Sequence, residues 1–224
     1  MNKLITLGCS LTYHGGWNIP LAELLKYELY DTSMYASSNI MQVNIFNNLL
    51  ITDQIKQNDI LIWQLTGQLR SGFSLIRTPN WHERLDDTPD YNDGCEYYIN
   101  LPANHFDNLP RTHILSNHPL TKIHMYDWPQ ELEATMSTII MSSKLFKVLV
   151  FVGWDGALTE IHDNYNKVID LLENNEVPHI KESCLSWHIR NKLELKNDSH
   201  PLQTNGHLYA EQVLYPKLQE LGWA

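Results

Sequence analysis

Two nearly continuous apolar runs most constrain what this chain can fold into. Residues 59–65 read Asp-Ile-Leu-Ile-Trp-Gln-Leu, and residues 147–152 read Lys-Val-Leu-Val-Phe-Val. Runs this short and this apolar are typical of strands that are buried on both faces. Such strands belong to parallel sheets, because the crossover connections between parallel strands place helices over both faces. The sequence therefore predicts a covered parallel sheet.

Segments with helical periodicity alternate with the predicted strands. A first strand is expected at 3–7 and a short one at 177–180, while helical patterns cover 20–29, 38–50, 131–145, 158–175 and 202–221. This alternation requires crossover connections and predicts a three-layer α/β/α sandwich with a central parallel sheet. With 224 residues, the chain is expected to form a single domain over 1–224.

The segment 70–128 breaks the alternation. It is rich in Trp, Tyr, His, Asn, Asp and Pro and has no sustained period. A stretch of this length inside a compact domain is usually functional. We expect an irregular insertion over the active-site edge of the sheet, where its aromatic and histidine side chains would line a substrate cleft. The alternative is a packed excursion or an oligomer contact.

Charge and hydropathy exclude several classes of function. The formal net charge is -10, and no basic stripe is present, which argues against nucleic acid or an anionic membrane as a partner. No apolar run is long enough to cross a bilayer. Met-Asn-Lys leads directly into the first strand, so we expect no signal peptide and a cytoplasmic protein, or alternatively a part of a phage particle. The three cysteines lack metal-ligand spacing and are expected to be reduced thiols.

The two ends of the chain carry three groups suited to acyl transfer. Gly8-Cys9-Ser10 follows the first strand, and Asp198-Ser-His200-Pro201 precedes the last helix. At the carboxyl edge of a parallel sheet, Ser10 could act as nucleophile, His200 as its base and Asp198 as the group that orients His200. The structural alternative is a turn at Ser10 and a helix entry in which Asp198 caps and Pro201 opens the helix.

These segments resemble the motifs of the SGNH (GDSL-like) hydrolase superfamily. Residues 8–12, Gly-Cys-Ser-Leu-Thr, resemble its Gly-Asp-Ser-x-Ser/Thr block, and residues 198–201 resemble its terminal Asp-x-x-His-Pro block with one residue fewer. Residues 36–39 resemble its second block, and residues 59–68 resemble the strand that leads to its third. The resemblance implies a flavodoxin-like fold and a serine esterase that uses Ser10, His200 and Asp198 and needs no metal or organic cofactor.

The resemblance also implies an oxyanion hole, in which this chain departs from the family. The backbone N–H groups of Ser10 and Ala36 would donate, together with a side-chain amide. The family's Gly-x-Asn-Asp block has no asparagine here, so Gln68 or Asn39 would supply that amide. Loss of one donor costs about 10²–10³ in rate. The alternative function is a non-catalytic binding or structural module with a degraded oxyanion hole.

The expected substrate is a small-molecule or glycan ester, with O-acetyl groups on a glycan preferred because the insertion is polar and aromatic. His14, Trp17 and Asp155 are candidate substrate contacts, although a packed tryptophan and ordinary turn residues are alternatives for them. The histidines of the insertion lack the spacing of a preformed metal site. The glycines do not form a dinucleotide-binding fingerprint.

Overall fold

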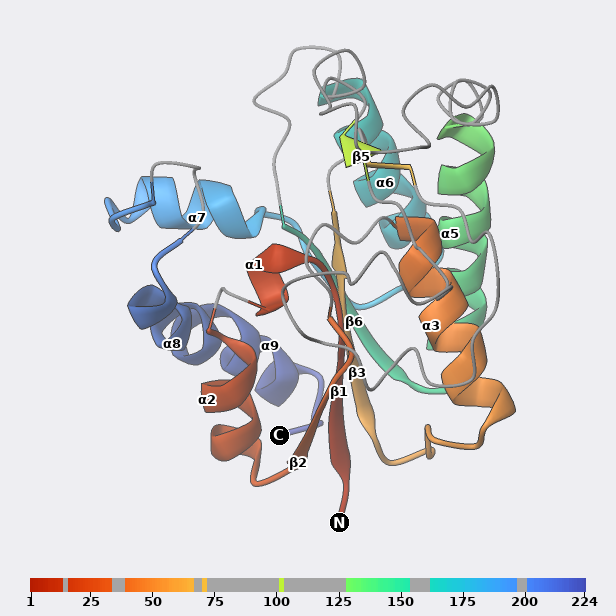
Figure 1. The fold of residues 1–224 in the computed structure, drawn as a ribbon, viewed down its shortest axis with the longest axis horizontal. Helices are drawn as coiled ribbons and strands as arrows, with labels where there is room; N and C mark the ends of the chain where they lie inside the picture. Colours follow the sequence, from red (N-terminus) through yellow and green to blue (C-terminus); the bar gives the residue numbers. More distant parts are fainter. Residues whose placement is uncertain are drawn as a thin grey trace, which may run out of the picture.

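The protein contains a five-stranded, wholly parallel sheet with the order β2-β1-β3-β6-β7 (Figure 1). The strands are β1 Lys3–Leu7, β2 Glu28–Asp31, β3 Ile60–Leu65, β6 Lys147–Val152 and β7 His179–Ile180. The structure is a computed structural model, and it describes residues 1–13, 16–33, 39–66, 70–71, 101–102, 128–153, 162–196 and 201–224. The predicted α/β class and the parallel sheet are confirmed.

Helices cover both faces of this sheet. On one face lie α3 Asn39–Ile51, α5 Trp128–Ser143 and α6 His162–Asn174; on the other lie α2 Asn18–Leu25, α7 Cys184–Arg190, α8 Gly206–Tyr209 and α9 Tyr215–Glu220 (Figure 1). Each face has its own hydrophobic core, which we call the α3 core and the α2 core. The result is the expected three-layer sandwich. No helix in the described part of the chain is long and apolar enough to span a membrane.

The central strand β3 shows how its sequence builds both cores. All six of its residues are buried. Trp63 and its neighbours two residues away face the α3 core, while Ile60 and Ile62 face the α2 core, because successive side chains of a strand point to opposite faces. Gln64 continues the second series and is fully buried as well. The strand therefore carries one polar side chain at its carboxyl end, on the α2 side.

The helix expected over 20–29 is shorter, and a strand follows it. Lys26 adopts a left-handed conformation with φ 58°, and the N–H of Tyr27 donates to the carbonyl of Ala22 at 3.0 Å. This is a Schellman-type helix end. The next four residues pair with β1 as the edge strand β2. The prediction of a continuous helix was wrong here because a four-residue strand continued the apolar spacing of the helix.

The last helix, expected over 202–221, is segmented. A 3₁₀ turn at Gln203–Asn205 precedes α8, and a π-helical turn at Ala210–Leu214 separates α8 from α9. Pro216 in the first turn of α9 has no N–H to donate, and a proline ring clashes with the carbonyl four residues earlier. A wider turn before the proline relieves that clash, which explains the interruption.

Several expectations fall partly or wholly beyond the described residues. Of the insertion expected over 70–128, the structure describes β4 Arg70–Ser71 and β5 Leu101–Pro102, which form an antiparallel pair, and Trp128, which begins α5. The helix expected over 158–175 is described from His162 onward, as α6. Helix α7 was not predicted at all.

Candidate active site

The topology singles out one edge of the sheet as a ligand site. The order of the strands across the sheet is that of flavodoxin-like folds. In these folds, ligands bind at the carboxyl ends of the strands, at the point where the strand order reverses and the chain continues toward the other edge of the sheet. Here β1 leads to α2 on one face, and β3 leads to α5 on the other. The switch point therefore lies between the ends of β1 and β3.

Ser10 lies directly after the first of these strands. The short helix α1, Ser10–Tyr13, begins at this residue, and the N–H of Thr12 donates to the carbonyl of Cys9 at 2.9 Å. A strand that ends in a tight turn places the following residue at the sheet edge. The structure thus brings the backbone of Ser10 to the predicted edge.

The other predicted site residues fall outside the described residues in most cases. These are Asp198 and His200, the oxyanion candidates Ala36 and Gln68, and the substrate-contact candidates His14 and Asp155. Leu195 and Pro201, which flank the Asp198–His200 segment, form an isolated antiparallel bridge. The roles of Asp198 and His200 stay predictions.

Gln64 contacts the turn that carries Ser10. Its Oε1 accepts hydrogen bonds from the backbone N–H of Cys9 at 3.1 Å and from the Thr12 hydroxyl at 2.8 Å. Its Nε2 donates to the carbonyl of Leu65 at 3.0 Å and lies 3.3 Å from the sulfur of Cys9. A buried amide with partners for both of its ends is a rigid connection. Sequence reasoning missed this residue, although a polar side chain inside an apolar strand was the available signal.

Two glycines leave space for this amide. A Cβ placed on Gly8 would overlap Thr12 Oγ1 and lie 2.9 Å from Gln64 Oε1. A Cβ on Gly153, at the end of β6, would overlap Gln64 Nε2 and lie 2.8 Å from the side chain of Leu11. We call the space between these two glycines the amide slot. It joins the carboxyl ends of three adjacent strands, β1, β3 and β6.

Asp31 organises the neighbouring loop at the end of β2. Its Oδ1 accepts from the Thr6 hydroxyl at 2.7 Å and from the Ser33 N–H and hydroxyl at 2.9 and 2.6 Å. Its Oδ2 accepts from Asn18 Nδ2 at 2.8 Å. These bonds tie β1, α2 and β2 together immediately before the segment that contains Ala36.

Asn39 connects the start of α3 to the end of β3. Its Oδ1 accepts from the N–H of Thr66 at 2.9 Å, and its Nδ2 donates to the carbonyl of the same residue at 3.3 Å. The amide of Asn39 therefore pairs with the backbone that leads to Gln68. This is a positioning contact, and the predicted oxyanion role of Asn39 stays a prediction.

Trp17 and Cys9 lie in the protein interior. Trp17 is 1% exposed, and its ring packs edge-on against Phe151 at a centroid distance of 5.4 Å. Trp17 is therefore packed in the α2 core, which was the structural alternative for this residue. To contact a substrate, its side chain would have to leave that core. Cys9 is fully buried, with its sulfur 3.4 Å from Gln64 Oε1.

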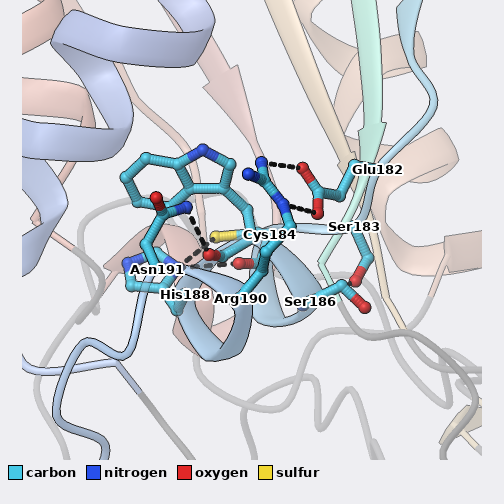
Figure 2. A network of polar contacts seen from close by, with 8 residues as sticks. Glu182, Ser183, Cys184, Ser186, His188, Arg190 and Asn191 are labelled. Carbon is cyan, nitrogen blue, oxygen red and sulfur yellow. Dashed lines mark hydrogen bonds and ion pairs between the residues drawn. The ribbon is translucent and has the colours of Figure 1, made fainter.

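Helix α7 borders the same edge and is fixed by its own polar contacts (Figure 2). Ser183 caps it by accepting from the N–H of Ser186 at 3.0 Å, and Arg190 makes a two-point ion pair with Glu182. The N–H of Leu185 donates to the carbonyl of Gly153 at 3.1 Å. This bond holds the start of α7 at the end of β6.

Two titratable groups in α7 are buried in their uncharged forms. The Nδ1 of His188 lies 2.7 Å from the carbonyl of Cys184, so this nitrogen carries the proton and donates. Burial lowers the pKa of His188, and the bond to Cys184 opposes that shift in part. Burial, together with the nearby Cys9, raises the pKa of the Cys184 thiol well above its usual range. Cys184 is therefore a poor nucleophile at neutral pH.

We expect His188 to make the protein less stable in mild acid. The pKa of His188 is lower in the folded state than the ordinary value near 6.5. The contribution of His188 to the unfolding free energy is therefore complete above pH 6.5 and is lost as the pH falls below that value. The unfolding free energy of His188→Phe should depend less on pH between 6.5 and 5, by up to about 1.4 kcal/mol per pH unit. Urea unfolding of both proteins across this range measures the difference, and parallel pH curves would contradict the prediction.

Three solved structures share this architecture over nearly their whole length. They are TesA (12% identity, TM-score 0.55, covering 98% of this chain and 99% of that one), the psychrotrophic esterase EstA from Pseudoalteromonas sp. inhibited by monoethylphosphonate (11%, 0.55, 99% and 98%), and the acetyl xylan esterase AlAXEase (14%, 0.52, 96% and 98%). No protein-family model and no curated protein matches the chain. The chain therefore has the flavodoxin-like three-layer α/β/α fold of these three structures, the fold that the resemblance of its motifs implied.

Proposed function

We propose that this protein is a serine esterase that hydrolyses a small acyl ester. The observation that carries the proposal is the position of Ser10, which begins α1 directly after β1, at the edge where flavodoxin-like sheets bind their ligands. Two of the structures with the same fold are esterases by description. The resemblance of residues 198–201 to the terminal family block supplies the base and its orienting carboxylate.

In the proposed reaction, Ser10 Oγ attacks the ester carbonyl while His200 takes the hydroxyl proton. The backbone N–H groups of Ser10 and Ala36, with the amide of Asn39 or Gln68, stabilise the negative charge on the carbonyl oxygen. Collapse of the tetrahedral intermediate breaks the ester bond, and protonated His200 gives its proton to the leaving alcohol. Water then attacks the acyl-serine with His200 as base, which releases the acid and regenerates Ser10. Asp198 orients His200 and stabilises its charged form throughout.

An O-acetyl group on a glycan is the substrate that we favour. The sequence between 70 and 128 combines many aromatic and polar residues, a composition that suits stacking on sugar rings, whereas lipid acyl chains would need a longer apolar channel. One structure with this fold is described as an acetyl xylan esterase. These two observations support the acetyl-glycan proposal.

Hydrolysis of a series of esters tests both parts of the proposal. The purified protein should hydrolyse p-nitrophenyl acetate faster than the butyrate and octanoate esters, and it should release acetate from acetylated xylan. Acetate release from simple esters alone would keep the esterase and reject the glycan. Wild-type hydrolysis no faster than that of Ser10→Ala would reject the esterase in favour of a non-catalytic module with the same fold.

A further inference from the structure

We infer that Gln64 is a positioning residue for the nucleophile: its buried amide holds the Cys9–Thr12 turn at the height and angle that place Ser10 for attack. The inference rests on the proposed function and adds to it a residue that none of the family motifs contains. It starts from the geometry of the amide slot.

The contacts of Gln64 bracket Ser10 on both sides. The bond from the Cys9 N–H fixes the residue before the serine, at 3.1 Å, and the bond from the Thr12 hydroxyl fixes the residue two positions after it, at 2.8 Å. Both bonds end on the same atom, Oε1, of a side chain that is fully buried. A single point on β3 thus restrains both ends of the nucleophile turn.

The surroundings of the amide leave it little freedom to move. Nε2 is bonded to the carbonyl of Leu65, and the positions of Gly8 and Gly153 have no room even for a Cβ. Close packing of this kind resists small shifts, because any displacement would break a buried hydrogen bond or cause overlap. The sheet therefore fixes the position of the amide, and the hydrogen bonds from Cys9 and Thr12 to the amide fix the position of the turn.

A positioning role predicts a loss of turnover that stability alone does not explain. Misplacement of a catalytic group by about 1 Å costs on the order of 10²-fold in rate. Gln64→Met keeps the length of the side chain but removes both acceptor and donor, so we expect kcat to fall about 10- to 100-fold. KM should change little, because Gln64 lies beneath the turn and is not exposed to substrate. Gln64→Glu keeps an oxygen acceptor for Cys9 and Thr12 and should recover part of the lost kcat.

Ile62→Ala is the matched control. Ile62 lies two residues earlier on the same strand, faces the same core and is fully buried, yet it belongs to the apolar part of that core. Its truncation should lower the unfolding free energy by about 2–5 kcal/mol. At a temperature well below its unfolding midpoint, it should keep wild-type kcat. An equal loss of kcat in Ile62→Ala and Gln64→Met would overturn the inference.

Amide hydrogen exchange gives a readout that does not depend on activity. The Cys9 N–H should exchange faster in Gln64→Met than in Ile62→Ala by more than any difference in global stability explains. If Gln64→Met does not fold, Thr12→Val removes one of the two bonds and should give a partial loss of kcat. Wild-type kcat in Gln64→Met, or unchanged Cys9 protection, would overturn the inference while leaving the esterase intact. An inactive wild-type protein would reject the esterase, and unchanged Cys9 protection would then also reject the restraint by Gln64.

Discussion

Ser10→Ala should reduce ester hydrolysis by on the order of 10⁴–10⁶-fold, with kcat carrying the loss. In the proposed reaction this hydroxyl forms the acyl intermediate, and the nearby hydroxyl of Thr12 is buried and donates to Gln64 Oε1. Cys9 is the nearest thiol in sequence, but it is fully buried against Gln64. His200→Ala should cause a loss of similar size, and the double variant should lose little more, because the two residues act as one unit in the proposed mechanism.

The control for this prediction is Ser143→Ala. Ser143 ends α5 at the opposite edge of the sheet, where its hydroxyl donates to the carbonyl of Ile140. This variant should keep full activity. Unfolding free energies of the serine variants should lie within about 1 kcal/mol of wild type. A Ser10→Ala protein that is folded and retains more than a few per cent of the activity would contradict the assignment of the nucleophile.

Gly153→Ala should destabilise the protein by about 2–4 kcal/mol. The added methyl group would occupy the position of Gln64 Nε2 and press against Leu11. Relief of the overlap would require the amide to leave its slot, which would break its bonds to the nucleophile turn and leave buried donors without acceptors. Urea unfolding of the variant and the wild type measures the loss, and we expect kcat to fall as well because the turn moves with the amide.

Gly222→Ala separates the lack of space from the general cost of replacing glycine. Gly222 has a left-handed backbone with φ +70°, and a Cβ there would have no atom within 4 Å. Its replacement should cost about 1 kcal/mol through backbone strain alone and should leave activity unchanged. If Gly153→Ala were no more destabilising than Gly222→Ala, the amide slot would not be as tight as described.

The sheet was largely predictable from local sequence, because buried strands are short, nearly continuous apolar runs. The bounds of β1 and β6 agree with the expected ones, and β3 begins one residue later than expected. The strand β2 was not predicted because it has only four residues, lies at a sheet edge and begins three residues after the end of α2, where it continues the apolar spacing of that helix. Helix α7 was not predicted because it is short and its composition is mixed, although Ser183 is a recognisable capping residue.

The sequence predicts where the candidate site lies, but it does not reveal the contacts that hold the described residues there. A serine after the first strand could be placed at the ligand-binding edge by topology alone. The contacts made by Gln64, Asp31 and Asn39 depend on tertiary structure, because each side chain bonds to an element far away in the sequence. Sequence patterns report burial and periodicity, and they do not reveal which distant group satisfies a buried polar atom.

The most direct test of the central claim is to map the covalent adduct of a fluorophosphonate by mass spectrometry. Such probes react with an activated serine, and one esterase with this fold is described as inhibited by monoethylphosphonate. We predict a single adduct on Ser10 that is absent from Ser10→Ala and strongly reduced in His200→Ala. An unmodified Ser10 after prolonged exposure, or an adduct on a different residue, would contradict the assignment of Ser10 as an activated nucleophile.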